Sequence, residues 1–458
     1  MTLEALEAVS PIDGRYWEEV RELAAYSSER ALIQTRFEIE ARYLIGLSGV
    51  GLIRPLTDQE QETLRKLGPE MSLDQVRRVK EIEAETRHDV KSMERTFREM
   101  VAGTSLEDLT EMIHFGLTSD DVNNLAYRLM LNRARKEVIT PTLNQLIEEI
   151  AERAEEYRDI PMLARTHGQP AVPTTLGKEM AITAVRLKRQ ARKLAEIKLT
   201  GKLNGAVGNY NAQTLAAPEV DWMEFSQTFV TSLGLEPNLF TTQINPYDDM
   251  VELFQAFQEV NGILLGFDQD LWRYISDKWL VQELKAGEVG SSTMPQKVNP
   301  ISFENSEGNI TIANGLWEAM GRKLLVSRLQ RDLSDTTVIR NVGVALAHGL
   351  LAYRHTLAGL RRTSPNLEKI SQDLNHDWSV LTEGVQTVLR RAGVKDSYRL
   401  VASLSQGQEI GPEDWINWVN GLPVDQSVKE ELLKLSPKDY LGRARELTDL
   451  ALKEIRSS

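Results

Sequence analysis

Apolar residues recur with a helical period along most of the chain. In residues 140–156 they fall on one stripe, which consists of Leu143, Leu146, Ile147, Ile150, Ala151 and Ala154. Thr140 followed by Pro141 fits a helix start, because Thr is a common N-cap residue and Pro suits the first helical position. The pattern therefore predicts an amphipathic helix that begins at Thr140.

Four further segments show the same period over unusual lengths. The sequence predicts helices at about 175–199, 247–284, 301–325 and 335–362, with Gly201 and Pro365 suited to end the first and the last. These helices exceed the average of about 11–12 residues. Long helices with short links, without an evident repeat of roughly 33–47 residues, predict an all-α protein built around a bundle of very long helices rather than a solenoid.

The chain has 458 residues, which is too long for one small core. We expect three helical domains: an N-terminal domain at 1–111, the long-helix bundle at 112–364 and a C-terminal domain at 365–458. Long helices with broad apolar faces often bury those faces between subunits, so a homo-oligomer is expected.

Composition removes several classes of function. The net charge is −13, without a basic stripe, which argues against nucleic acid as a partner. The absence of cysteine excludes disulfides and thiolate chemistry, and the sequence contains no HExxH, GxGxxG or Walker motif, so neither a metal nor another cofactor is expected. The chain shows no signal-like start and no apolar run of roughly 18 residues. A cytoplasmic location without a membrane partner is expected.

Two polar segments interrupt the helical pattern in its second half. The stretch Gly287–Pro300, GEVGSSTMPQKVNP, precedes a helix start and is suited either to bind an anion or simply to connect two helices. Arginines cluster soon afterwards, at Arg328, Arg331 and Arg340, where they can form a positive pocket or a solvated helix face.

Three histidine-containing segments precede them. His167 lies in the turn-like RTHGQP, where it can act as a general acid or base or have a structural role. Thr118 and Ser119 in HFGLTSDD stand before a helical run and are suited to cap it. His88 is followed by Asp89, which suggests a held imidazole, although adjacent residues in a helix do not face each other.

Together these segments resemble the adenylosuccinate lyase family of the fumarase/aspartase superfamily, whose members eliminate fumarate from succinyl-type substrates. GSSTMPQKVNP is similar to the superfamily's signature loop. The resemblance extends over about residues 10–341 and is closest to the bacterial branch; it rests on SPIDGRY, the HDV at His88, HFGLTSDD, RTHGQP, TTQINP and SRLQRDLSDTTVIRN. One position departs, since Gln296 stands where many relatives have His.

The resemblance implies a C–N lyase that releases fumarate from adenylosuccinate, giving AMP, and from succinylaminoimidazole carboxamide ribotide. It also implies a homotetramer in which three subunits build each active site. Gln296 also resembles the argininosuccinate lyase family, whose members often have the sequence MPQK at this position. That family lacks the HDV and SRLQRD segments and is the second alternative. A non-enzymatic scaffold, as in some lens crystallins, is the third, but the polar residues of the motifs are intact.

The resemblance also assigns roles to individual residues. Ser291 is implied as the general base, supported by Lys297, with His167 as the general acid and His88 close by. The implied substrate-binding residues are Arg15, Tyr16, Arg87, His88, Asp89, Thr118, Ser119, Gln243, Asn299, Arg331, Ser334, Thr336, Thr337 and Arg340.

Overall fold

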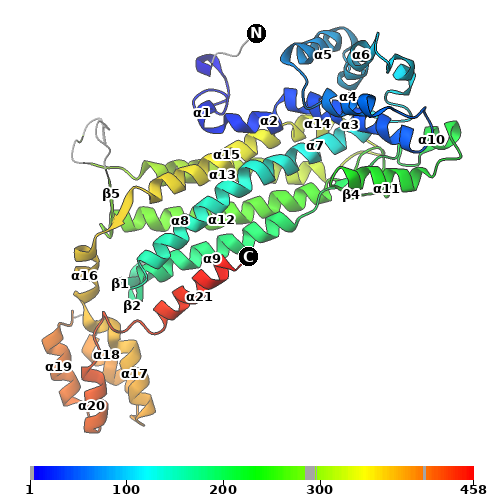
Figure 1. Ribbon diagram of the computed structural model, residues 1–458. Helices are drawn as coiled ribbons and strands as arrows, with labels where there is room; N and C mark the ends of the chain where they lie inside the picture. Colours follow the sequence, from blue (N-terminus) through cyan, green and yellow to red (C-terminus); the bar gives the residue numbers. More distant parts are fainter. Residues whose placement is uncertain (1–4, 284–293, 295–296, 406–408, 458) are drawn as a thin grey trace. The chain divides into compact units, whose positions relative to one another are not determined.

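The computed structural model describes residues 5–283, 294, 297–405 and 409–457 (Figure 1). These residues are mainly helical, which confirms the predicted all-α class. The strands are short and form three two-stranded sheets in the described residues: β1 with β2, β3 with β4, and β5 with β6. No helix in these ranges is both long enough and apolar enough to cross a bilayer.

The chain divides into two compact units. The first comprises residues 1–142, 191–261 and 309–352, and the second comprises 143–190, 262–308 and 353–458. The division into three domains at 111 and 364 stays a prediction. Five longer helices have residues in both units: α8 (Thr140–Glu156), α9 (Leu176–Glu196), α12 (Asp248–Ser276), α13 (Ile301–Leu324) and α15 (Val342–Leu360).

The first unit also contains further helices and one pair of strands. They are η1 (Ala5–Glu7), α1 (Trp17–Val20), η2 (Arg21–Leu23), α2 (Ala24–Ser27), α3 (Glu29–Gly49), α4 (Asp58–Leu67), α5 (Leu73–Thr86), α6 (Asp89–Val101), η3 (Glu107–Met112), α7 (Ser119–Ala134), η4 (Arg135–Ile139), β3 (Thr200–Gly201), α10 (Asn211–Ala216), α11 (Trp222–Ser232), β4 (Glu236–Pro237) and α14 (Ser334–Ile339). Aromatic side chains fill its core, as where Trp317 stacks on Phe254 with ring centroids 4.7 Å apart.

The second unit contains the remaining elements. They are β1 (Pro161–Thr166), β2 (Gln169–Thr175), β5 (Leu280–Gln282), β6 (Thr363–Pro365), α16 (Leu367–Asn375), η5 (Trp378–Leu381), α17 (Thr382–Arg391), α18 (Ser397–Ser405), α19 (Pro412–Gly421), α20 (Gln426–Leu433) and α21 (Ala444–Arg456). Antiparallel pairing joins β5 to β6, with Gln282 opposite Thr363.

The predicted helix start at Thr140 is wrong. Thr140 has helical backbone angles, φ −61° and ψ −44°, and follows η4 directly, so it lies inside a helical run rather than capping one. Pro141 cannot donate a backbone hydrogen bond, and its ring crowds the carbonyl four residues earlier. The wider π turn of η4 just before it accommodates the proline. The predicted apolar stripe and the end at Glu156 are confirmed.

Two other helix predictions need correction. The helix predicted at 247–284 ends at Ser276, because Lys278 has φ +61° and Leu280–Gln282 form β5. A short apolar run does not distinguish strand from helix by periodicity. The helix predicted at 335–362 is two helices, α14 and α15. The Asn341 side-chain amide donates to the carbonyls of Thr337 and Val338, which ends α14. The predictions at 175–199 and 301–325 are confirmed as α9 and α13.

Candidate active site

His167 lies at the tip of a β-hairpin. Strands β1 and β2 pair antiparallel up to Thr166 opposite Gln169, which leaves His167 and Gly168 as a two-residue turn. Their φ angles are +54° and +75°, as a type I′ turn requires. His167 is exposed and therefore reachable by a ligand. The predicted turn between two long helices is confirmed, and a short strand lies on each side of it.

The hairpin is held at its end by Arg165. The Arg165 guanidinium donates to the Gly168 carbonyl at 3.2 Å and lies 5.3 Å from the centre of the Trp279 ring. Trp279 is fixed in turn, because its Nε1 donates to Asp373 Oδ2 at 2.8 Å. The cation–π contact positions the Arg165 side chain, and the hydrogen bond of the indole N–H positions Trp279. Together they hold the turn in one conformation.

Ser291 and Gln296 lie outside the described residues. Of the signature segment, Lys297 is exposed and Asn299 is half-buried. The Val298 carbonyl accepts a hydrogen bond from Gln282 Nε2 at 3.2 Å, which ties the end of the segment to β5. Helix α13 begins two residues after Asn299. The prediction that this segment precedes a helix is confirmed.

His88 caps helix α6 and is not inside it. Its Nδ1 accepts a hydrogen bond from the Lys91 backbone N–H at 3.2 Å, so in this arrangement Nε2 bears the proton when the ring is neutral. Adjacent residues inside a helix do not face each other, but His88 precedes the helix, so its imidazole can approach the Asp89 carboxylate. Its Nδ1 lies 3.9 Å from Asp89 Oδ1. Arg87, with φ +52°, ends α5 immediately before it.

Asp89 brings together cations from distant parts of the chain. Its Oδ2 accepts from Arg36 at 2.6 Å and lies 3.9 Å from the Arg340 guanidinium. Burial raises the pKa of Asp89, but Arg36, the Val90 backbone N–H and His88 together outweigh this, so the pKa is lowered and the carboxylate is charged at neutral pH. The structure therefore gathers His88, Asp89 and Arg340, three of the residues singled out from sequence.

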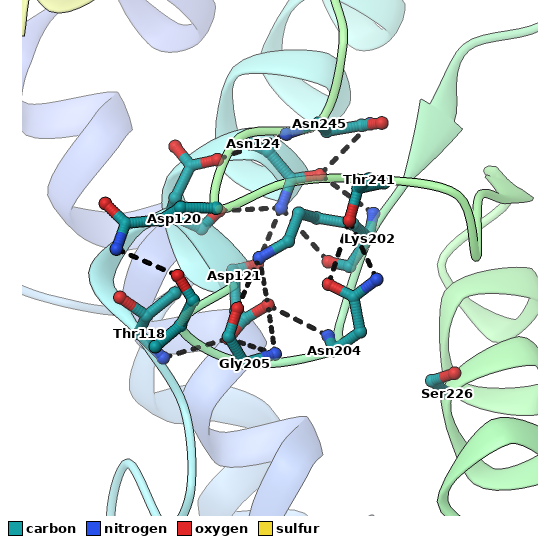
Figure 2. A network of polar contacts seen from close by, with 12 residues as sticks. Thr118, Asp120, Asp121, Asn124, Lys202, Asn204, Gly205, Ser226, Thr241 and Asn245 are labelled. Carbon is teal, nitrogen blue, oxygen red and sulfur yellow. Dashed lines mark hydrogen bonds and ion pairs between the residues drawn. The ribbon is translucent and has the colours of Figure 1, made fainter. Parts of the chain in front are cut away.

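Thr118 and Ser119 lie at the N-terminus of α7. The Thr118 backbone N–H donates to Asp121 Oδ2 at 2.9 Å, which confirms the predicted capping role of this segment (Figure 2). Both residues are half-buried. Free N–H groups and the helix dipole favour an anion at such a position. Upstream, His114 Nδ1 lies 2.5 Å from the buried Glu40 carboxylate.

Arg331 provides a second position at which an anion could bind. Its Nε is buried and has no hydrogen-bond partner among the described residues. Asp120 is buried nearby, and burial raises the pKa of this carboxyl to about 6 while Lys202 and Arg331 oppose the rise. A buried, unsatisfied guanidinium N–H is unusual in a native protein and suggests a missing polar partner. An anionic ligand would supply that partner.

The remaining predicted residues lie on loops and at helix starts. The Ser334 hydroxyl and backbone N–H both donate to Asp332, and Gln243 Nε2 donates to the Ala206 carbonyl at 3.0 Å. Thr336 is half-buried and Thr337 is exposed. The Arg15 guanidinium lies 5.9 Å from the centre of the Tyr16 ring. Among the described residues, no hydrogen bond or ion pair joins Arg15 or Tyr16 to the other predicted site residues.

Sequence reasoning missed the buried charges behind these residues. Arg36 is 2% exposed and Lys202 is 0% exposed. Nothing in the local pattern distinguishes them from a charged residue on a solvated helix face, since burial depends on distant partners such as Asp89 and Asp121. No group of three His, Asp or Glu side chains in the described ranges could hold a metal ion.

Comparison with known proteins identifies the family. A family model described as lyase matches residues 21–315, and one described as adenylosuccinate lyase C-terminal matches residues 327–441. Adenylosuccinate lyase from Escherichia coli strain K12 is 45% identical over 98% of this chain and 99% of its own length. The enzyme of the same name from Dictyostelium discoideum is 41% identical over 96% of this chain and 97% of its own.

Solved structures agree on the fold. The 3-carboxy-cis,cis-muconate lactonizing enzyme from Pseudomonas putida has a TM-score of 0.78 at 20% identity, covering 96% of this chain and 98% of its own. Fumarate lyase from Mesorhizobium sp. BNC1 has a TM-score of 0.76 at 17% identity, covering 95% and 97%. Similarity at this level concerns the fold alone. The family models and the relatives at 41–45% identity establish that this chain belongs to the adenylosuccinate lyase family.

Proposed function

We propose that this protein cleaves adenylosuccinate to AMP and fumarate, and the succinylaminoimidazole carboxamide ribotide to its carboxamide and fumarate. The observation that carries the proposal is the near-complete alignment with curated adenylosuccinate lyases at 45% identity. Both substrates share a ribose phosphate and a succinylamino group. One site that binds the two succinyl carboxylates at one end and the phosphate at the other therefore suffices for both.

The reaction is a β-elimination. A base removes a proton from the succinyl carbon next to a carboxylate, the electron pair forms the fumarate double bond, and the C–N bond breaks with its electrons on the departing nitrogen. Negative charge develops on the carboxylate, so electrostatic stabilisation is the main energetic requirement. Ser291 is the proposed base, and Lys297 with the backbone N–H groups of its loop would favour its ionised form.

His167 is the proposed general acid that protonates the departing amine. Its exposed position at a hairpin tip suits a group that must meet a substrate and exchange protons with water. Imidazole is the side chain whose proton affinity is best matched to neutral pH. We propose that His88, adjacent to the charged Asp89, helps to orient the substrate.

The two ends of the substrate require separate anion sites. We propose that Thr118 and Ser119 at the start of α7, with Asn299, bind the succinyl carboxylates. Arg331 and Arg340 are the proposed phosphate ligands, because a guanidinium binds phosphate through two parallel hydrogen bonds. The other proposed nucleotide contacts are Arg15, Tyr16, Arg87, Asp89, Gln243, Ser334, Thr336 and Thr337.

We further propose a homotetramer with shared active sites. The long helices keep large apolar side chains exposed, including Ile182 on α9, Trp272 on α12 and Ile312 on α13, which are 42%, 43% and 51% exposed. Exposed apolar side chains on helices that already pack in a bundle favour an interface in which other subunits cover them. A cytoplasmic location and the absence of a nucleic-acid partner belong to the same proposal, the latter supported by the net charge of −13.

Fumarate release from adenylosuccinate, followed by absorbance with EDTA present, tests the activity. We expect full turnover and competition by AMP, because AMP occupies the nucleotide part of the site. Argininosuccinate should not be cleaved. Turnover of argininosuccinate without competition by AMP would support the alternative family, and a requirement for added divalent metal would contradict the mechanism.

A further inference from the structure

Asp121 and Lys202 form an ion pair that is fully removed from solvent. Lys202 Nζ lies 2.8 Å from Asp121 Oδ1, and both side chains are 0% exposed (Figure 2). Desolvation of two charges is costly, and a pair of this kind is often no more stabilising than apolar residues of similar volume. The positions that the pair fixes therefore explain its presence better than a contribution to the free energy of unfolding does.

The Asp121 carboxylate joins two separate chain segments. Its Oδ2 accepts from the Thr118 N–H at 2.9 Å, at the N-terminus of α7. Its Oδ1 accepts from the Asn204 N–H at 3.0 Å, and the Gly205 N–H lies 3.2 Å from both oxygens. With Lys202 these donors use the approximately four acceptor positions of a carboxylate. No acceptor is left for water or for another side chain.

Lys202 also links the turn at residues 204–205 to helix α7. Its Nζ also donates to the Gly205 carbonyl at 3.0 Å, which closes the turn whose N–H groups point at Asp121. Its backbone is fixed to α7 by Asn124, whose side chain accepts from Lys202 N and donates to Lys202 O, each at 3.0 Å. Residues 202–205 and the first turn of α7 therefore form one rigid body.

This body extends to the segment that carries Gln243. Asn204 Nδ2 donates to Thr241 Oγ1 at 2.8 Å, a contact visible in Figure 2. Gln243 Nε2 donates to the Ala206 carbonyl at 3.0 Å. Hydrogen bonds thus lead from Thr118 through Asp121 and Asn204 to Thr241 and on to the Gln243 segment.

We infer that Asp121 and Lys202 are positioning residues that fix the carboxylate clamp at Thr118–Ser119 relative to the nucleotide contact Gln243. The inference rests on the proposed function, which assigns those contacts. Lys202 has an electrostatic role as well. An unpaired Asp121 carboxylate so close to the clamp would repel an anionic substrate, and the buried ammonium cancels that charge.

Three variants test the inference: Asp121→Asn, Lys202→Met and the double variant. An amide in place of the carboxylate cannot accept from Thr118 and from the 204–205 turn together, and methionine removes both Nζ hydrogen bonds. We expect kcat/KM for adenylosuccinate to fall at least tenfold in each. In the reverse reaction KM for fumarate should rise more than KM for AMP, because the clamp holds the succinyl end.

The double variant separates positioning from stability. It removes both charges of the pair, so its Tm should recover most of what each single variant loses, while its kcat/KM should stay low. Recovery of both Tm and kcat/KM would show a purely structural role and overturn the inference. If either single variant fails to fold, the double variant alone still decides.

Glu60→Gln is the matched control. Glu60 is likewise a buried carboxylate that accepts from an N-cap backbone N–H, that of Thr57 at 2.8 Å, and pairs with a cation, Arg54. It touches no proposed site residue, so its Tm should fall with the kinetic constants unchanged. A similar result for Asp121→Asn refutes the inference. An inactive wild-type protein instead refutes the proposed function and is recognised before any variant is compared.

Discussion

Arg340 Nη1 donates to Glu29 Oε2 at 2.9 Å, so a proposed phosphate ligand is paired with a carboxylate in this structure. Both side chains are about two-fifths exposed, 40% for Arg340 and 38% for Glu29. A bound phosphate and Glu29 would compete for the same guanidinium N–H groups. If Arg340 binds phosphate as proposed, Glu29 lowers the affinity of the site for anions to the extent that the ion pair must be broken.

Glu29→Gln should lower KM for adenylosuccinate and Kd for AMP. Exposed ion pairs are worth up to about 1 kcal/mol, which corresponds to roughly fivefold in affinity. AMP titration by calorimetry measures the change. Glu83→Gln is the control, since Glu83 shares Lys80 with Glu29 but is not paired with Arg340. Weaker AMP binding by Glu29→Gln would mean that Glu29 orients Arg340 and does not compete for it.

Asp268 predicts a pH dependence of stability. It is 1% exposed, Thr356 Oγ1 donates to its Oδ1 at 2.8 Å, and its Oδ2 has no hydrogen-bond partner among the described residues. Burial raises the pKa of this carboxyl to about 8, from 3.8 in the unfolded chain. A pKa raised on folding means that ionisation opposes folding. The penalty is absent below pH 3.8 and grows as the pH rises towards 8.

Asp268→Asn removes that penalty because an amide does not ionise. The free energy of unfolding of the variant, minus that of the wild type, should rise with pH by at most about 1.4 kcal/mol per pH unit between pH 4 and 8. Denaturant unfolding at several pH values measures this difference. Asp58→Asn, at an exposed position, is the control and should show a flat difference. A flat difference for Asp268→Asn would mean that Asp268 is ionised without penalty in the folded protein.

The backbone at His167 allows its chemical role to be separated from its conformation. His167 has φ +54°, a region that Asn tolerates and that other residues enter at a cost of about 1 kcal/mol. His167→Asn and His167→Ala should both reduce kcat by about 10²–10⁴-fold, because neither can donate the proton. Only the Ala variant should also lose thermal stability. Near-normal kcat in His167→Asn would exclude His167 as the general acid.

Local patterns were sufficient to locate the long helices and the motif segments, although not all of the helix ends. The apolar stripe of residues 140–156 and the capping of α7 follow from side-chain spacing and from residue type. Leu280–Gln282 could not be assigned in the same way, because a three-residue strand depends on its partner β6, about eighty residues later. The helical Thr140–Pro141 depends on a π turn that compensates for the proline.

The candidate site was predictable to the extent that its residues lie in recognisable motifs. His88, Thr118 and Arg340 were singled out in this way. Their supporting partners were not, because Arg36 and Lys202 lie in stretches where a cation normally faces water. Their burial depends on acids more than fifty residues away, and no local pattern contains that information.

The last prediction is that each active site combines residues from different subunits, and Ser291 and His167 are the two catalytic residues on which it can be tested. Helix α12 has 29 residues, and at 1.5 Å per residue it spans about 44 Å. The proposal assigns Gln243, before this helix, and Ser291, after it, to the same substrate. A nucleotide cannot bridge the two ends of such a helix, whereas helices from different subunits packed antiparallel can bring opposite ends together.

Complementation tests this sharing. Ser291→Ala and His167→Ala are each expected to be inactive as homo-oligomers. If the two proteins are dissociated mildly, mixed and reassociated, some sites receive an intact Ser291 from one subunit and an intact His167 from another, and fumarate release should return. With random reassociation of equal amounts, about a quarter of such sites should be intact, since each residue is supplied intact with a probability of about one half. Each variant taken alone through the same cycle should stay inactive. An inactive mixture whose mixed oligomers are demonstrated by mass spectrometry refutes the sharing of these two residues, and a fully active monomer in sedimentation refutes subunit sharing altogether.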